Sequence, residues 1–150
     1  MNEMYLKMIL ALPDEFFDGW EWQAGDKALS INDQYKRELL LLTTAPLEKL
    51  NYNDNVTLLF PHSVDGVTVE EYIFNLRPIP RQEQLQKIAK KLLENEAKRE
   101  VTNLELLKEF YYFCGDHCAP EYKDETFGCL WMQFIVMHRD NKLWIEGNWV

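Results

Sequence analysis

The stretch that decides the fold runs from Val56 to Leu76 and reads VTLLFPHSVDGVTVEEYIFNL. Its two ends, Val56–Phe60 and Val67–Leu76, are rich in β-branched and aromatic residues, which favour strands. Asp65-Gly66, between them, is a turn signal. The pattern therefore predicts two antiparallel strands joined by a turn.

Further candidate strands precede this stretch. Lys27–Ile31 is a short one, and Glu38–Thr44 contains four consecutive leucines. Asn51–Asn55 reads NYNDN and favours a turn, because Asn and Asp side chains bond their own backbone and tolerate left-handed conformations. The first half of the chain therefore predicts a small antiparallel sheet of three to five strands.

The segment before the sheet is expected to be mostly loop. Residues 14–26 contain Gly19 and Gly25, and we expect Trp20 and Trp22 to cover the core. Further upstream, apolar side chains recur at helical spacing in residues 3–12, which favours a short helix and leaves a strand open.

The second half of the chain predicts helices. Pro80 is expected at a helix start, where its missing N–H has no partner to lose. The apolar stripe of that helix follows the 3, 4, 7 spacing and consists of Leu85, Ile88, Ala89, Leu92 and Leu93. Thr102–Glu105 is a capping box that opens a second helix, and Gly115 is expected to end it.

The last predicted helix runs from Phe127 to about Arg139, after a polar loop over residues 116–125, and either Asp124 or Thr126 could cap it. Its sequence is apolar almost all round, which predicts a central buried helix, although a strand is left open here. At least one tryptophan of the C-terminal tail is expected to fold back onto the core. Together these patterns predict a single α+β domain over residues 1–150. In it, a small antiparallel sheet from the first half packs against about three helices from the second.

The charge balance limits the partners. The chain has 150 residues with 16 basic and 25 acidic side chains, a net charge of −9. Phosphate backbones repel such a protein, so we expect no binding to a nucleic acid backbone. Residues 1–75 hold 13 acids and 5 bases, a net of −8, whereas residues 76–150 have a net of −1. The first half could therefore present a negative face to a basic partner.

Cysteine usage and hydropathy favour the cytoplasm. Three cysteines are an odd number and imply no disulfide framework, as expected in a reducing compartment. No run approaches the roughly 20 apolar residues that span a bilayer, and the start of the chain lacks the features of a signal peptide, so no membrane association is expected.

One cluster could carry chemistry. Cys114, His117, Cys118 and Cys129 lie close in sequence, and thiolates with imidazole suit zinc. No C-x2-C pair is present, and free cysteines are commonly small buried hydrophobic residues, so structural roles are the first expectation. A zinc site, or a small enzyme built on this cluster, is the alternative.

No catalytic motif is found elsewhere. The glycines form no phosphate-binding loop, and neither Ser30 nor Ser63 lies in a G-x-S-x-G turn. The paired carboxylates are sequence neighbours, which diverge on a helix or strand, so they predict no acid–base dyad. We therefore expect no catalytic residues and no cofactor, and we favour a non-enzymatic protein.

Scattered motifs resemble those of an uncharacterised family of small proteins encoded by phages and prophages of Gram-positive bacteria. The motifs are Trp22 followed by Gly25-Asp26, the run Pro80-Arg81-Gln82-Glu83-Gln84-Leu85, the run Leu130-Trp131-Met132-Gln133-Phe134-Ile135-Val136-Met137, and Lys142-Leu143-Trp144. The family supplies no activity to carry over, so no residue inherits a role. The resemblance implies a phage-derived protein that acts in a bacterial cytoplasm.

These observations favour a small acidic protein that binds a protein partner or associates with itself. Its aromatic residues, 13% of the chain, include tryptophan and tyrosine, which are favoured anchors at interfaces. A virion-associated structural protein is a further alternative.

Overall fold

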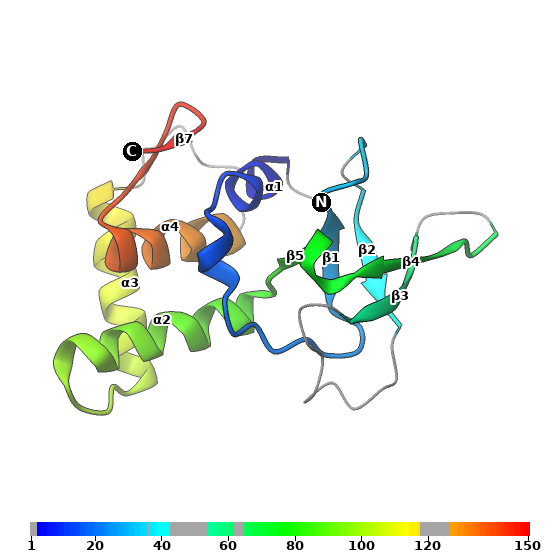
Figure 1. Ribbon diagram of the computed structural model, residues 1–150. Coiled ribbons are helices and arrows are strands. Elements are labelled where there is room, and N and C mark those ends of the chain that lie inside the picture. The colour runs from blue at the N-terminus through cyan, green and yellow to red at the C-terminus, as the bar shows by residue number, and fades with distance from the viewer. Residues whose placement is uncertain (1–2, 36, 43–53, 62–64, 118–126) are drawn as a thin grey trace. The chain divides into compact units, whose positions relative to one another are not determined.

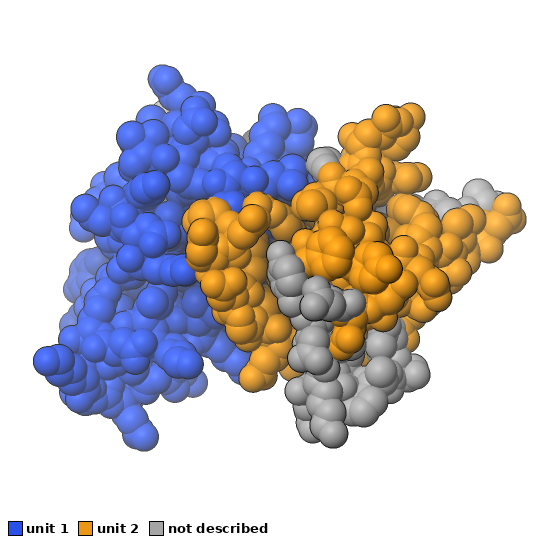
Figure 2. Space-filling view, in the orientation of Figure 1, with its two compact units in different colours: residues 1–12, 80–150 blue, residues 13–79 orange. Residues whose placement is uncertain are grey.

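The computed structural model describes residues 3–35, 37–42, 54–61, 65–117 and 127–150, and its elements are drawn in Figure 1. The first half forms a five-stranded antiparallel sheet, and the described helices lie mostly in the second half, which confirms the predicted α+β class. The chain divides into two compact units, coloured in Figure 2: residues 13–79, the sheet unit, and residues 1–12 with 80–150, the helical unit. That the whole chain is one domain stays a prediction.

The sheet unit is a meander with a returning last strand. Its strands are β1 (Lys27–Ser30), β2 (Leu39–Leu41), β3 (Asn55–Leu59), β4 (Thr68–Tyr72) and β5 (Leu76–Ile79). The order in the sheet is β4-β3-β2-β1-β5, and all neighbours are antiparallel. β5 therefore pairs with the side of β1 that β2 leaves open.

Two predicted strands differ from the observed ones. The predicted strand Val67–Leu76 is broken by the 3-10 turn η3 (Ile73–Asn75), whose first amide donates to the Asp54 carbonyl at 2.8 Å. This turn takes the chain from one edge of the sheet to the opposite edge. β2 is shorter than the predicted Glu38–Thr44, and Thr43 and Thr44 lie outside the described residues, as do residues 51–53 of the predicted turn.

The short turn requires the sheet to curl. In a flat sheet the two edges would lie four strand spacings apart, about 19 Å. The four residue steps from Tyr72 to Leu76 can span at most about 14 Å. In agreement with a curled sheet, the Ser30 hydroxyl on β1 donates to a Glu71 carboxylate oxygen on β4 at 3.1 Å, although β2 and β3 separate these strands in the sheet order.

Curling gives the sheet unit a core of its own. The buried side chains of this core are Trp22, Ala28, Leu39, Leu41, Val56, Leu58, Ile73 and Leu76. Trp20, Phe60 and Val69 pack against this cluster and are partly buried. Trp22 covers the core as predicted, and Trp20 lies at its edge.

The helical unit is built around its last helix. Its helices are α1 (Glu3–Leu10), α2 (Gln82–Ala97), α3 (Asn103–His117) and α4 (Phe127–Asp140). α4 contacts the other three, so the prediction of a central buried helix is confirmed and the strand alternative is wrong. Phe134, fully buried, makes edge-on ring contacts with Phe110, Phe113 and Trp131 at centroid distances of 5.5–5.9 Å.

The helix starts agree with the sequence in part. α2 begins at Gln82, so Pro80 precedes the helix and Arg81 is its N-cap, with the Arg81 amide donating to Gln84 Oε1 at 2.8 Å. Pro80 has a different structural role from the predicted one: its carbonyl accepts a 2.6 Å hydrogen bond from the buried Tyr5 hydroxyl. The predicted cap of α3 is present, because the Glu105 amide donates to Thr102 Oγ1 at 3.1 Å.

The end of α3 was predicted wrongly. The helix continues through Gly115 to His117, and Gly115 does not adopt a positive φ. Packing explains the difference. Phe113 contacts Phe134 of α4, and the His117 ring lies 5.2 Å from the Phe113 ring. These contacts stabilise the last turn by more than the low helix propensity of Gly115 destabilises it. The proposed caps of α4, Asp124 and Thr126, lie outside the described residues.

A hairpin ends the chain. β6 (Trp144–Ile145) and β7 (Asn148–Trp149) are joined by Glu146-Gly147, both with positive φ, as a tight two-residue hairpin turn requires. The Trp144 and Trp149 rings meet at 4.9 Å, and the Trp149 indole N–H donates to the Met8 carbonyl at 3.2 Å. Both tail tryptophans thus pack on the helical unit, as expected.

The aromatic cluster predicts a large stability effect. Replacing Phe134 with Ala should lower the free energy of unfolding by about 3–5 kcal/mol, because it leaves a cavity among three rings. Tyr111→Ala, on the exposed face of α3, is the control and should change it by less than about 0.5 kcal/mol. Urea unfolding followed by circular dichroism measures both, and equal losses would contradict the assigned core.

Candidate functional site

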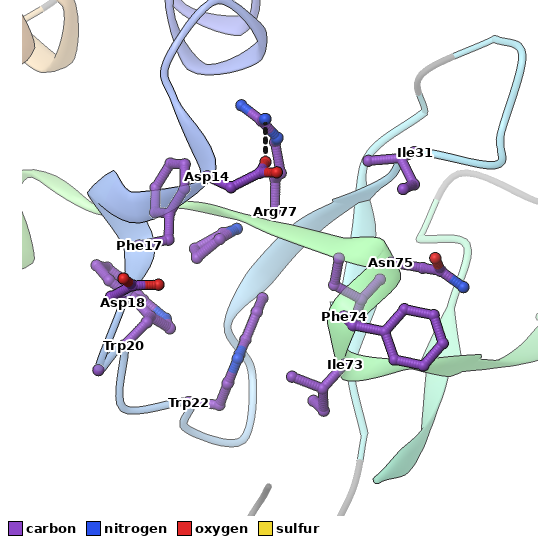
Figure 3. Close-up of a pocket in the computed structure, with 13 residues that line it drawn as sticks. Asp14, Phe17, Asp18, Trp20, Trp22, Ile31, Ile73, Phe74, Asn75 and Arg77 are labelled. Atoms are coloured by element: carbon purple, nitrogen blue, oxygen red, sulfur yellow. Dashed lines mark hydrogen bonds and ion pairs between the residues drawn. The ribbon is translucent and has the colours of Figure 1, made fainter. Parts of the chain in front are cut away.

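A groove of about 440 Å³ lies on the sheet unit. One wall comes from η1 (Asp14–Phe17) and the segment after it, and the other from η3 and the start of β5 (Figure 3). Its lining includes Asp14, Phe17, Asp18, Trp20, Trp22, Ile31, Ile73, Phe74, Asn75, Arg77 and Pro78. We call it the aromatic groove.

The first wall is a row of aromatic rings in edge-on contact. Phe16 and Phe17 lie 5.1 Å apart, Phe17 and Trp20 6.3 Å, and Trp20 and Trp22 6.5 Å between ring centres. The chain reaches this arrangement through η1 and a backbone bond from the Trp20 amide to the Phe17 carbonyl at 3.0 Å. Edge-on pairs are a preferred geometry of aromatic rings, so the row is stabilised from within.

A tight turn holds Trp22 at the sheet. The Asp26 amide donates to the Gln23 carbonyl at 3.0 Å, and the Gln23 amide donates back to the Asp26 carboxylate at 2.8 Å. Gly25 provides a φ of +85°, which other residues rarely adopt. Trp22, Gly25 and Asp26 are residues of the family-like motif, and they have a structural role here.

Glu71 fixes the second wall. Its carboxylate accepts hydrogen bonds from the side chains of Asn75 at 2.8 Å and Ser30 at 3.1 Å, and from the Tyr72 amide at 3.1 Å, with Asn32 at the 3.5 Å limit. Partial burial by itself would raise the pKa of Glu71, but these donors outweigh it and lower the pKa below its ordinary value. Because Asn75 belongs to η3, the carboxylate sets the position of Ile73 and Phe74 in the groove.

The charges of the groove are mostly acidic. Arg77, largely covered, donates to the exposed carboxylate of Asp14 at 2.6 Å, which ties β5 to η1. Asp18 is exposed, and in the described part of the chain its carboxylate has no ion-pair partner. The groove therefore has a free acidic group at its edge, while its one described cation is already paired.

The groove also contains an unpaired donor. Trp20 Nε1 is buried and has no hydrogen-bond partner among the described residues. An unpaired buried N–H costs about 1–3 kcal/mol, so such groups are rare and point to a missing acceptor. Trp20 itself is partly exposed and lines the groove, whereas its Nε1 atom is covered.

A second hollow, of about 530 Å³, lies on the helical unit between the ends of α2, α3 and α4. Arg99 donates to Glu105 at 2.9 Å across the α2–α3 connection, and Glu96 of α2 lies 3.2 Å from His138 Nδ1 of α4. The Val101 amide donates to the Glu94 carboxylate at 3.1 Å in the same connection. This hollow is therefore explained by local structure.

The predicted zinc cluster is resolved only in part. Cys129 is fully buried in α4, Cys114 is half-buried in α3, and His117 packs its ring against Phe113. Cys118 lies outside the described residues. Over the described ranges, no group of three or more His, Cys, Asp or Glu side chains is arranged to hold a metal ion, and zinc at the four-residue cluster stays a prediction.

Sequence reasoning missed the aromatic groove. Phe16, Phe17, Trp20 and Trp22 lie within seven residues, an unusual density, but we interpreted the tryptophans as core covers. The other wall comes from residues 73–78, more than fifty positions away. The two walls come together only in the folded sheet. The density of aromatic residues was therefore the one signal of the groove in the sequence.

A comparison with protein-family models, with curated proteins and with solved structures finds no match to this chain. Among the residues with described structure, no helix is long and apolar enough to cross a membrane.

The Glu71 network predicts a pH-dependent stability. Because folding lowers the pKa of Glu71, its contribution should be present above the ordinary carboxyl pKa of 4.5 and should be lost as the pH falls through the lowered value. Glu71→Gln should therefore cost about 1 kcal/mol of unfolding free energy at pH 7 and much less at pH 3. Glu70→Gln, the exposed neighbour on β4, is the control, and a pH-independent cost for Glu71→Gln would contradict the assigned role.

The zinc hypothesis has a direct test. If the cluster binds zinc, purified protein should contain about one equivalent by elemental analysis, and Cys118→Ser should lose it. Purified protein that contains no metal and is nevertheless fully stable in thermal unfolding would contradict this hypothesis.

Proposed function

We propose that the protein is a non-catalytic protein-binding module whose binding surface is the aromatic groove. The observation that carries the proposal is the row of Phe17, Trp20 and Trp22 facing η3 across a hollow. Aromatic residues are enriched where proteins bind one another, and tryptophan is prominent among the residues that contribute most of the binding energy.

The charge of the sheet unit supports a basic partner. Residues 13–79 contain 12 acidic and 5 basic side chains, a net charge of −7, whereas the rest of the chain has a net of −2. Complementary charge steers association and selects against acidic partners. Among the described polar side chains of the groove, Arg77 is paired with Asp14 and Asn75 donates to Glu71, so both have structural roles.

The place of action follows from the resemblance. Motif similarity to small phage and prophage proteins supports a role in the cytoplasm of a bacterial host, where the protein would bind a host or phage protein. Cysteines in the described residues that form no disulfide are compatible with such a reducing compartment.

Site-specific photo-crosslinking tests the proposal. A photoreactive amino acid placed at Asp18, at the groove edge, should give a discrete covalent adduct with a protein in bacterial cells that carry the gene. The same amino acid at Tyr35, exposed on the same unit but outside the groove, is the matched control and should not give this adduct.

Trp20→Ala should remove the adduct formed from position 18, because it removes the centre of the aromatic row. Circular dichroism and thermal unfolding check that this variant still folds. No adduct from position 18, or the same adduct from both positions, would contradict binding at the groove.

A further inference from the structure

The helix α3 has a second apolar face that the described structure leaves open to solvent. Leu104, Leu107 and Tyr111 have the spacing i, i+3 and i+7 and are 76%, 51% and 76% exposed. Tyr112 beside them is 54% exposed, and its ring lies 6.1 Å from the ring of Tyr111. The buried residues of α3 lie on another side of the helix. We call this surface the exposed α3 face.

The exposed α3 face continues into small residues near the end of the helix. Cys114, three positions after Tyr111, is half-buried, and Gly115 is exposed. Beyond its own turn of helix, no described atom lies within 4 Å of the place where a Cβ of Gly115 would stand. A glycine in a helix costs about 1 kcal/mol relative to alanine, and neither a positive φ nor a close neighbour in the described structure requires one here. A second backbone that approaches the helix closely would require it.

The α3 helix of a second copy, in antiparallel orientation, matches the exposed α3 face. When Leu107 lies against Tyr111 of the second copy, Leu104 lies against Cys114 and Gly115 of that copy, because each pair of positions has the same sum. Large side chains then meet small ones, and the heptad-like spacing 104, 107, 111, 114 supplies both sides of each layer. The arrangement has twofold symmetry, as an isologous interface requires, and antiparallel helix dipoles attract each other.

The area of the face also suits a second copy. A fully exposed tyrosine side chain offers roughly 200 Å² and a leucine slightly less, so the four exposed side chains present roughly 450 Å² to solvent. Two copies would bury roughly 900 Å² through these side chains alone, and the flanking residues bring the total to the roughly 1,000 Å² that a specific interface needs.

The distribution of charge favours self-association on this unit. The helical unit has a net charge of −2, whereas the sheet unit has −7, so repulsion between two copies is weaker when they meet through the helical unit. Lys108 is the charged side chain next to the face, and its Nζ lies 6.0 Å from the centre of the Tyr112 ring. Its apolar stem extends the surface that a second copy would cover.

We propose that the protein forms a twofold-symmetric dimer in solution through antiparallel packing of the exposed α3 faces. Because the interface is close to the lower size limit, its dissociation constant is on the order of 10 µM, and the protein at about 1 µM is a monomer. Dimerisation is therefore separable from folding. It is also independent of binding at the aromatic groove, which belongs to the sheet unit.

Sedimentation equilibrium of the full-length protein between about 1 and 200 µM tests the proposal, and the mass should rise from one chain to two. Gly115→Gln should weaken the dimer at least about tenfold, because it fills the space that the second helix needs. The same variant at about 1 µM should keep or raise its thermal midpoint, since glutamine is a better helix former than glycine. Loss of the dimer could then not be due to misfolding.

Two controls accompany this variant. Glu109→Gln places the same side chain on the same helix, at an exposed position nearly opposite the face by helical periodicity, and should not change the dimer. Trp20→Ala, in the aromatic groove, should not change it either, so failure of the dimer leaves the proposed groove function untouched.

A pair of charge variants tests the register. Leu107→Glu and Tyr111→Lys should each be monomeric, because each homodimer would bury unpaired charges in two layers. An equimolar mixture of the two should form a mixed dimer, since glutamate then lies against lysine in one layer and the other layer stays apolar. A monomer up to about 200 µM, a dimer that Gly115→Gln does not weaken, or a mixture that stays monomeric would overturn the proposal. A face that only a different protein covers would appear as the first of these outcomes.

Discussion

Glu71 accepts hydrogen bonds from Ser30 on β1 and from Asn75 in η3, so one carboxylate joins parts of the sheet that are distant in strand order. This tie and the three-residue turn between β4 and β5 keep the sheet curled. The curl encloses the core of the sheet unit, and η3 lines the groove opposite the aromatic row. The two walls meet because β5, which contributes to the second wall, pairs with β1, the strand that follows the aromatic row in the chain.

The groove combines three properties that are informative together. Its rings offer apolar surface, its edge offers negative charge, and its wall contains a donor without an acceptor in the described structure. Each alone is common on protein surfaces. Their convergence on the more acidic unit of the protein supports the proposed binding function.

The fold could largely be predicted from the sequence, and the site could not. The apolar stripe of α2, the almost wholly apolar sequence of α4 and the apolar run of β3 identified these elements, because such signals are local. The errors fall where tertiary contacts prevailed over a local signal: Gly115 lies inside α3 because Phe113 and His117 pack there, and Ile73 begins a turn inside a predicted strand. On α3, Leu106, Phe110 and Phe113 are buried, whereas Leu104 and Tyr111 are exposed.

The sequence by itself determined the α+β class, the acidic first half and the supply of aromatic residues, since composition and local periodicity are properties of the chain alone. Only the tertiary structure decided that Phe17, Trp20 and Trp22 would face Ile73 across a groove. The physical reason is that the closure of the sheet depends on a turn length and on one carboxylate with donors up to 41 residues away, and local sequence patterns contain no information on such distant pairings.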